Sequence, residues 1–243
     1  MQSVYNDQTR AALKAALVRL GIDATQDAQK LLLEHLRLLK EKNRELNLTR
    51  ITSTEEAVLL HIEDSLSAFP EFMERSGRFC DIGTGGGFPG LPLGILSQRP
   101  GILLDSVKKK AAAVQSFIDR MELGNLQAKG MRSEELALKE GASFETVVAR
   151  AVSSLNVVEE LATPLLSMGG QLIAMRGTES QEQIDAGMRA AEKLGLSLVF
   201  TREFSIGDEK SRYKRSIFVF EKTRESRVKV PRRPGMAVKR PLA

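Results

Sequence analysis

The chain has 243 residues, of which 42% are hydrophobic and 28% are charged, and its formal net charge is +5. This composition is typical of a folded, water-soluble protein and excludes a disordered or disulfide-rich chain. The single cysteine, Cys80, excludes an internal disulfide. Neither His35 nor His61 has a second histidine or cysteine at ligand spacing, so we expect no metal site.

The N-terminal residues contain no basic region followed by an apolar core, and no apolar stretch is long enough to span a bilayer. We therefore expect a cytoplasmic protein without a membrane partner. The sequence does not settle the oligomeric state, and a monomer is our expectation.

The first predicted elements are helices, over residues 7–20 and 26–46 and from Thr54 towards Leu66. In the second of these, Leu32, Leu36 and Leu39 recur at helical spacing. We expect residues 1–70 to form an N-terminal helical cap that packs on the sheet formed by the rest of the chain.

From residue 78 onward, predicted strands and helices alternate. The strands are expected over 78–82, 101–105, 126–129, 145–150 and 170–175, and the helices near 90–97, 108–122, 133–139, 154–166 and 179–194. This alternation indicates an α/β fold with a doubly wound, mostly parallel sheet and helices on both faces.

The alternation of strands and helices stops at the C-terminal end of this region. Residues 196–204 and 215–221 predict a hairpin, joined by a polar loop that contains Gly207 and Asp208, so the last strand should be antiparallel. We expect a seven-stranded sheet domain over residues 71–222 and a basic tail over residues 223–243.

A glycine-rich loop follows the first predicted strand, within Phe-Cys-Asp-Ile-Gly-Thr-Gly-Gly-Gly-Phe-Pro-Gly at 79–90. A strand, a glycine loop and a helix in succession bind nucleotide-like cofactors in doubly wound sheets. Gly85, Gly87 and Gly90 fit the dinucleotide pattern G-x-G-x-x-G, with Asp105 about 20 residues further on. A tight turn without a ligand is the simpler alternative, although so many glycines cost backbone entropy that a turn does not require.

The same loop also fits D-x-G-x-G-x-G, through Asp81, Gly83, Gly85 and Gly87. That form resembles the first motif of S-adenosylmethionine-dependent methyltransferases. A carboxylate beside the loop would repel a pyrophosphate, which is an anion held at a helix N-terminus. S-adenosylmethionine carries a sulfonium and an ammonium instead, so Asp81 favours it over a dinucleotide.

Two further strand ends carry polar residues. Asp105 ends the second strand, where a carboxylate can accept the ribose hydroxyls of an adenosyl group or cap the following helix. Arg150 ends the fourth strand, where a guanidinium can hold an anion, stack on a base or pair with a surface acid. The Asp/Asn-Pro-Pro-aromatic motif of many amino-group methyltransferases is not present at this position.

The C-terminal stretch is strongly basic, with Glu225 as its lone acid. Its cations are Lys222, Arg224, Arg227, Lys229, Arg232, Arg233, Lys239 and Arg240. Both a solvated tail that keeps the protein soluble and a flexible arm that contacts RNA phosphates remain open.

Several motifs in order resemble one family. They are Asn47-Leu48-Thr49, His61-Ile62-Glu63-Asp64-Ser65-Leu66, the glycine loop with its Phe-Pro-Gly ending, Leu104-Asp105-Ser106, Ala149-Arg150-Ala151 and Pro231-Arg232-Arg233-Pro234-Gly235. Over residues 40–240 the chain resembles the glucose-inhibited division protein B (RsmG) family, the bacterial 16S ribosomal RNA guanine-N7 methyltransferases.

The resemblance implies a Rossmann-like methyltransferase fold, S-adenosylmethionine as cofactor, and 16S ribosomal RNA or the small ribosomal subunit as substrate. It places Ser133 and Glu134 around the adenine and assigns His61, Asp64 and Ser65 to shaping the site. Arg150 is the expected catalytic residue. The expected cofactor-binding residues are Asp81, Gly83, Gly85, Phe88, Asp105, Ser133, Glu134 and Arg150.

Guanine N7 bears a lone pair and no proton, so its methylation needs alignment of the reacting atoms rather than a general base. The lack of an obvious catalytic histidine or cysteine is therefore compatible with an enzyme. Two other classes remain open on the residues alone. They are a NAD-type oxidoreductase, for which no hydride-transfer residue is visible, and a module that binds RNA without methyl transfer.

Overall fold

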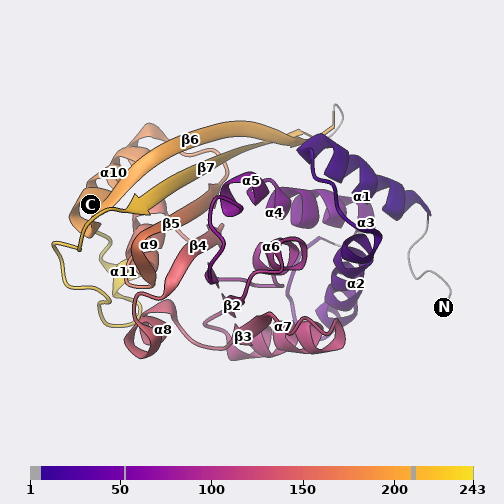
Figure 1. Cartoon of the computed structure of the whole chain (residues 1–243), viewed down its shortest axis with the longest axis horizontal. Helices are drawn as coiled ribbons and strands as arrows, with labels where there is room; N and C mark the ends of the chain where they lie inside the picture. Colours follow the sequence, from indigo (N-terminus) through magenta and orange to yellow (C-terminus); the bar gives the residue numbers. More distant parts are fainter. Residues whose placement is uncertain (1–6, 52, 209–211, 243) are drawn as a thin grey trace.

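A seven-stranded sheet forms the centre of the molecule, with strand order β3-β2-β1-β4-β5-β7-β6 (Figure 1). The computed structural model describes residues 7–51, 53–208 and 212–242. The strands are β1 (Phe79–Ile82), β2 (Gly101–Leu104), β3 (Leu126–Lys129), β4 (Phe144–Arg150), β5 (Leu166–Arg176), β6 (Leu196–Gly207) and β7 (Arg212–Lys222). The first five pair in parallel, and β7 is antiparallel to both of its neighbours. The predicted mostly parallel sheet with an antiparallel last strand is confirmed.

Helices account for most of the rest of the described chain. They are α1 (Asp7–Leu20), α2 (Gln26–Asn43), α3 (Thr54–Ala57), the π-helical turn η1 (Val58–Glu63), α4 (Asp64–Leu66), α5 (Phe69–Phe72), α6 (Gly90–Ser97), α7 (Lys108–Arg120), α8 (Ser133–Glu140), α9 (Leu155–Ala162), α10 (Gln181–Leu194) and α11 (Met236–Lys239).

Two predicted helix ends were wrong. Helix α2 ends at Asn43 rather than at residue 46, because the Asn43 side chain accepts hydrogen bonds from the backbone N–H groups of Leu48 and Thr49 and so fixes a turn. Helix α9 ends at Ala162, because Leu166 already pairs with β4 as the first residue of β5. The short helices α5 and α11 were not predicted.

The two faces of the sheet are covered by different helices, as Figure 1 shows. On one face, Leu36 of α2, Leu91 of α6 and Phe117 of α7 belong to one buried apolar cluster. On the other face, Cys80 and Val147 of the sheet pack with residues of α8, α9 and α10. Helices α2, α6 and α7 therefore share one core rather than forming separate ones. The boundaries at residues 70 and 222 remain predictions, and residues 1–6 and 243 lie outside the described chain.

Glu159 on α9 is a buried acid in the second of these cores. Its side chain is fully buried, and neither carboxyl oxygen has a hydrogen-bond partner among the described residues. Burial raises the pKa of Glu159 well above its ordinary value. The folded protein therefore holds a proton that the unfolded chain releases, so stability is lost as the pH rises above the unfolded pKa.

We predict that Glu159→Leu raises the free energy of unfolding at pH 8 by about 1–3 kcal/mol, the usual cost of an unsatisfied buried polar group. The gain in the free energy of unfolding should shrink at pH 4.5, near the ordinary pKa of a glutamate, where about half of the unfolded wild-type chains also carry this proton. Urea denaturation at the two pH values measures it, with the exposed Glu74→Leu as control. An equal effect at both pH values would contradict the assignment of a buried neutral acid.

Candidate active site

A cavity of about 500 Å³ opens at the carboxyl ends of the parallel strands. Its walls come from segments far apart in the sequence, namely the loop after α2, η1, α4, the glycine loop and the ends of β4 and β5. The antiparallel strand β7 contributes Arg215, Ser216 and Ile217, and β6 contributes Phe204. Ligands of doubly wound sheets bind outside this edge, so we take the cavity as the candidate active site.

The glycine loop adopts backbone conformations that favour glycine. Gly83, Gly85 and Gly87 have φ angles of +73°, +57° and +98°. A side chain at Gly85 would meet only the carbonyl oxygen of Gly83, at 4.0 Å, so this part of the loop is open to a ligand. Gly83 is different, because a Cβ there would lie 2.7 Å from a methyl group of Val152.

Two carboxylates hold the loop by its backbone. Asp81 Oδ2 accepts a hydrogen bond from the N–H of Gly90 at 2.9 Å, and Asp105 Oδ2 accepts one from the N–H of Gly85 at 3.1 Å. Asp81 is fully buried, and burial raises its pKa to about 7. Its other oxygen, Oδ1, has no hydrogen-bond partner among the described residues.

Phe88 lies between two imidazole rings. The ring of His35 stacks on it at 4.4 Å and 24°, and that of His61 at 4.4 Å and 10°. His35 Nε2 shares a hydrogen bond of 2.8 Å with the carbonyl oxygen of Gly86, and His61 Nε2 shares one of 2.9 Å with Thr49 Oγ1. Burial lowers the pKa of His35 to about 4 and that of His61 to about 3, so both are neutral at pH 7.

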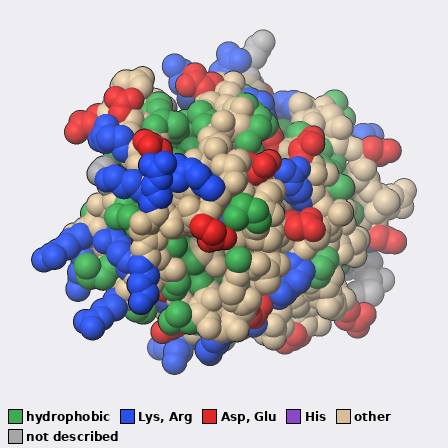
Figure 2. Space-filling model, turned by 60° about the vertical axis from the view of Figure 1, so that its left-hand side comes forward, with side chains coloured by type: hydrophobic (Ala, Val, Ile, Leu, Met, Phe, Trp, Pro, Cys, Tyr) green, Lys and Arg blue, Asp and Glu red, His purple; other side chains and the backbone are tan. Residues whose placement is uncertain are grey.

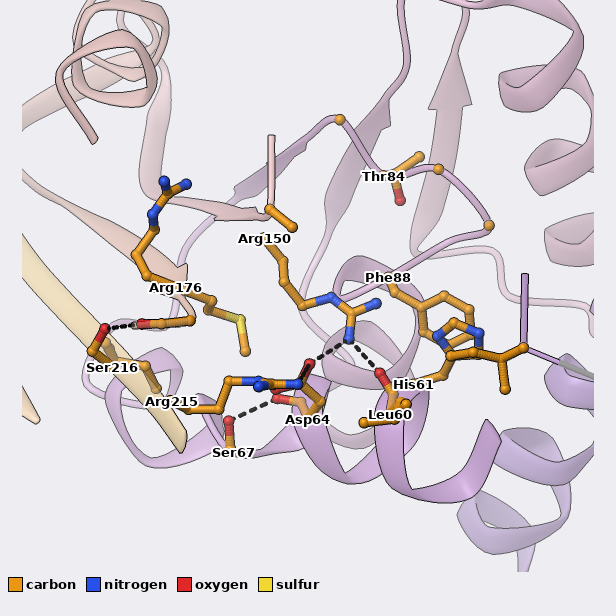
Figure 3. A pocket seen from close by; sticks show the side chains of 18 of the residues that line it. Leu60, His61, Asp64, Ser67, Thr84, Phe88, Arg150, Arg176, Arg215 and Ser216 are labelled. Carbon is orange, nitrogen blue, oxygen red and sulfur yellow. Dashed lines mark hydrogen bonds and ion pairs between the residues drawn. The ribbon is translucent and has the colours of Figure 1, made fainter. Parts of the chain in front are cut away.

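Asp64 joins two arginines across the cavity (Figure 3). Its Oδ2 accepts from Arg150 Nη1 at 3.1 Å, and its Oδ1 accepts from Arg215 Nε at 2.8 Å. Arg150 Nη1 also donates to the carbonyl oxygen of Leu60 at 2.8 Å, and the Arg150 guanidinium lies 5.5 Å from the centre of the Phe88 ring. Two cations and one anion thus share this corner of the site.

The structure brings together some of the predicted site residues. Gly83, Gly85, Phe88 and Arg150 all line the cavity. Asp81 is not in its wall and lies under the loop. His61 and Asp64 line the cavity, and the Ser65 hydroxyl donates to the carbonyl oxygen of His61. Whether these residues bind a cofactor stays a prediction.

Three other predicted residues lie outside that cavity. The second carboxylate oxygen of Asp105 accepts from the N–H of Val107 at 2.8 Å, so Asp105 also fixes the start of α7. Ser133 and Glu134 begin α8 and are buried, and Glu134 Oε1 accepts from the N–H of Gly235 at 2.9 Å. Glu134 therefore bonds to the C-terminal segment.

Arg215 and Arg176 are cavity residues that the sequence did not single out. Arg176 Nε donates to Glu179 at 2.6 Å, so its charge is paired locally. Arg215 stands in a basic run between Lys214 and Ser216, and nothing in that run distinguishes it. Only the pairing of β7 with β5 brings it to the carboxyl edge of the sheet.

Two solved structures with a similar fold are named as methyltransferases. A putative sarcosine dimethylglycine methyltransferase from Galdieria sulphuraria matches 72% of this chain and 89% of its own, with a TM-score of 0.54 and 13% identity. A SAM-dependent methyltransferase from Methanosarcina mazei matches 64% and 98%, with a TM-score of 0.51 and 12% identity. The chain therefore has the α/β fold of the SAM-dependent methyltransferases.

The sequence narrows this class to one family. The family model described as rRNA small subunit methyltransferase G (GidB) matches residues 28–212. Ribosomal RNA small subunit methyltransferase G of Clostridium tetani is 32% identical over 95% of this chain and 97% of that protein. That of Deinococcus radiodurans is 36% identical over 96% and 92%. The chain belongs to the rRNA small subunit methyltransferase G family, so the family predicted from the motifs is confirmed.

None of the helices in the described part of the chain is long and apolar enough to cross a membrane. No group of three or more histidine, cysteine or acidic side chains within residues 7–51, 53–208 and 212–242 is placed to hold a metal ion.

We predict that acid destabilises the protein through His35. Its pKa lies near 6.5 in the unfolded chain and near 4 in the folded protein, so its contribution is complete above pH 6.5 and is lost as the pH falls towards 4. Because proton binding is linked to folding, this side chain alone should lower the free energy of unfolding by about 2 kcal/mol between pH 7.5 and pH 5.

His35→Phe keeps an aromatic ring beside Phe88 but cannot titrate. We expect it to be less stable than the wild type at pH 7.5, because the bond to Gly86 is lost, and to lose less stability on going to pH 5. Urea denaturation at both pH values measures how much the free energy of unfolding changes with pH in the variant and in the wild type. An identical change in the two proteins would show that the folded protein protonates His35 as readily as the unfolded chain does.

Proposed function

We propose that this chain transfers the methyl group of S-adenosylmethionine to N7 of a specific guanine in the 16S ribosomal RNA of the small subunit. The observation that carries the chemistry is the character of the cavity wall. Its imidazole, His61, is neutral and stacked, and its acid, Asp64, is bonded to two arginines. Such a wall can position a base but is poorly suited to removing a proton, and N7 has no proton to remove.

The residues around the glycine loop fit S-adenosylmethionine. The open side of Gly85 allows a close approach, and the carboxylate of Asp105 has the sign that suits a cationic cofactor rather than a pyrophosphate. The bound cofactor would supply an electrophilic methyl group on a sulfonium. Gly83, Gly85, Phe88 and Asp105 would hold it.

Arg150 and Arg215 would hold the RNA side of the site. Each guanidinium carries five N–H groups, and the bonds to Asp64 and Leu60 leave some of them for a ligand. With one carboxylate between two cations, the cluster has an excess positive charge. That charge suits a phosphodiester, a carboxylate or the carbonyl oxygen of a base.

The helices of residues 1–70 would act as a cap that shapes this site. His35 of α2 bonds to the glycine loop, and His61 and Asp64 contact Phe88 and Arg150.

We further propose a cytoplasmic monomer as the working form. The free, buried thiol of Cys80 suits a reducing compartment.

The test is the transfer of labelled methyl from S-adenosylmethionine to small subunits that lack the modification, with the position mapped by chain cleavage at 7-methylguanosine. Label at one guanine N7 supports the proposal. Binding of S-adenosylmethionine without transfer would send the search to another substrate. Binding of nicotinamide dinucleotide instead would favour the oxidoreductase class.

We predict that Arg150→Ala lowers kcat/KM for this transfer by on the order of 100-fold, because the guanidinium that aligns the substrate is lost. The folded state should persist by circular dichroism. Arg189→Ala, which removes an exposed arginine on α10, is the matched control and should keep wild-type activity. Full activity of the Arg150 variant would remove this residue from the mechanism.

We predict that Asp64→Asn lowers the free energy of unfolding by about 3 kcal/mol, because two largely buried guanidiniums lose their shared counter-ion. Adding Arg215→Met to this variant should recover part of the loss, since one of the two like charges is removed. A double-mutant cycle by urea denaturation measures the coupling. Strictly additive losses would mean that Asp64 does not couple to Arg215.

A further inference from the structure

The C-terminal segment does not leave the molecule after β7. The backbone N–H of Arg227 donates to the carbonyl oxygen of Lys193 at the end of α10, at 2.8 Å. Val228 and Val230 then pack against the apolar cluster beneath α9 and α10. Figure 1 shows this segment running back along the molecule towards α9 and α8, and Figure 2 shows lysine and arginine side chains gathered on the left of the face turned forward.

Arg232 fastens the segment to α9. Its Nε and Nη2 donate to the two oxygens of Glu160 at 2.6 and 2.5 Å, and its Nη2 also donates to the carbonyl oxygen of Arg240 at 2.7 Å. The Glu160 side chain is only 3% exposed. Asn156, at the start of α9, donates to the carbonyl oxygen of Leu242 at 3.1 Å. These bonds close residues 232–240 into a loop that lies on the helix.

The tip of this loop reaches α8. Gly235, with φ of +80°, donates its N–H to Glu134 Oε1 at 2.9 Å. The Ser133 hydroxyl donates to Glu134 Oε2 at 3.3 Å, so both oxygens of Glu134 have partners inside the protein. Glu134 is 5% exposed and follows the carboxyl end of β3. Its carboxylate is therefore used to hold the C-terminal segment.

The C-terminal segment shares an apolar cluster with residues that follow β3 and β4. Leu242, Met131 and Val152 pack against the same apolar cluster, and Val152 contacts Gly83. Asp105, which holds the loop at Gly85, directly follows β2, the strand between β1 and β3. Through Glu134, the C-terminal segment is bound to the start of α8, which follows β3, the neighbour of β2 in the sheet.

We propose that residues 231–242 form a fixed wall at the adenosyl end of the cofactor site, and that Glu134 is a positioning residue which anchors this wall at Gly235. The proposal rests on S-adenosylmethionine being the cofactor. It gives the C-terminal motif Pro231-Arg232-Arg233-Pro234-Gly235 a role in cofactor affinity. Contact of the basic tail with RNA phosphates is the rival role.

Four variants separate the two roles by charge. Arg232→Met and Glu160→Gln break the same ion pair but change the net charge in opposite directions. Arg233→Met removes the same charge as Arg232→Met from an adjacent, exposed arginine without touching Glu160. The fourth variant combines Arg232→Met with Glu160→Gln. The wild type is measured first, because its failure to bind S-adenosylmethionine would count against the proposed function itself.

We expect Arg232→Met and Glu160→Gln each to raise the Kd for S-adenosylmethionine about tenfold, the scale of one charge-assisted bidentate pair. The double variant should be no worse than either single variant, and Arg233→Met should match the wild type. Calorimetric titration gives the Kd values, and circular dichroism checks folding. If Arg232→Met does not fold, Arg232→Lys replaces it, since lysine keeps the charge but not the paired bonds.

Two results would overturn the proposal. One is an S-adenosylmethionine Kd within twofold of the wild type in Arg232→Met, Glu160→Gln and the double variant. The other is an equal loss of RNA affinity in Arg232→Met and Arg233→Met, with a gain in Glu160→Gln and unchanged cofactor affinity. The second pattern would assign the segment to RNA phosphates, and each lost contact would lower the slope of log affinity against log salt by roughly 0.7–0.9.

Discussion

The loop from Gly83 to Phe88 has few side chains of its own, so it is held by groups from other parts of the chain. Asp105 bonds to Gly85, His35 bonds to Gly86, and Asp81 bonds to Gly90 just beyond the loop. Backbone conformations that favour glycine cost entropy to fix, and these three bonds offset part of that cost. A ligand that needs a bare backbone surface can then meet one that is already ordered. The other parts of the site contribute to keeping this backbone surface ordered and uncovered.

The N-terminal helices pack against the glycine loop through Phe88. His35 comes from α2 and His61 from η1, and the two rings enclose Phe88. Because both imidazoles are neutral at pH 7, the stack brings no charge into the core. Asp64 lies one turn after His61, so the segment that covers Phe88 also positions Arg150. Residues 58–64 therefore pack on Phe88 at the end of the glycine loop and also fix the charge on the substrate side.

The sequence predicted the parts of the fold and site that have a local pattern. Alternating strands and helices indicated the doubly wound sheet, and the polar residues at strand ends placed Asp81, Asp105 and Arg150 at one edge. Arg215 could not be found in this way, because it is 151 residues from Asp64 and reaches it only through the order β5-β7-β6. The ion pair of Arg232 was equally hidden, since its partner Glu160 is 72 residues away and a basic tail is usually solvated. Composition describes charge, but the partner of a charge depends on topology.

The charge cluster has a consequence for the proposed reaction. Methylation at N7 moves a positive charge from the sulfonium to the guanine, so the site keeps its total charge while the cation shifts towards the RNA side. Arg150 and Arg215 hold an anion or a carbonyl oxygen well, but two uncompensated guanidiniums would oppose a cationic base. Asp64 between them offsets one of the two charges while its bonds fix both side chains. One buried carboxylate can thus orient the substrate-side cations and limit their repulsion of the product, which accounts for an acid that acts without accepting a proton.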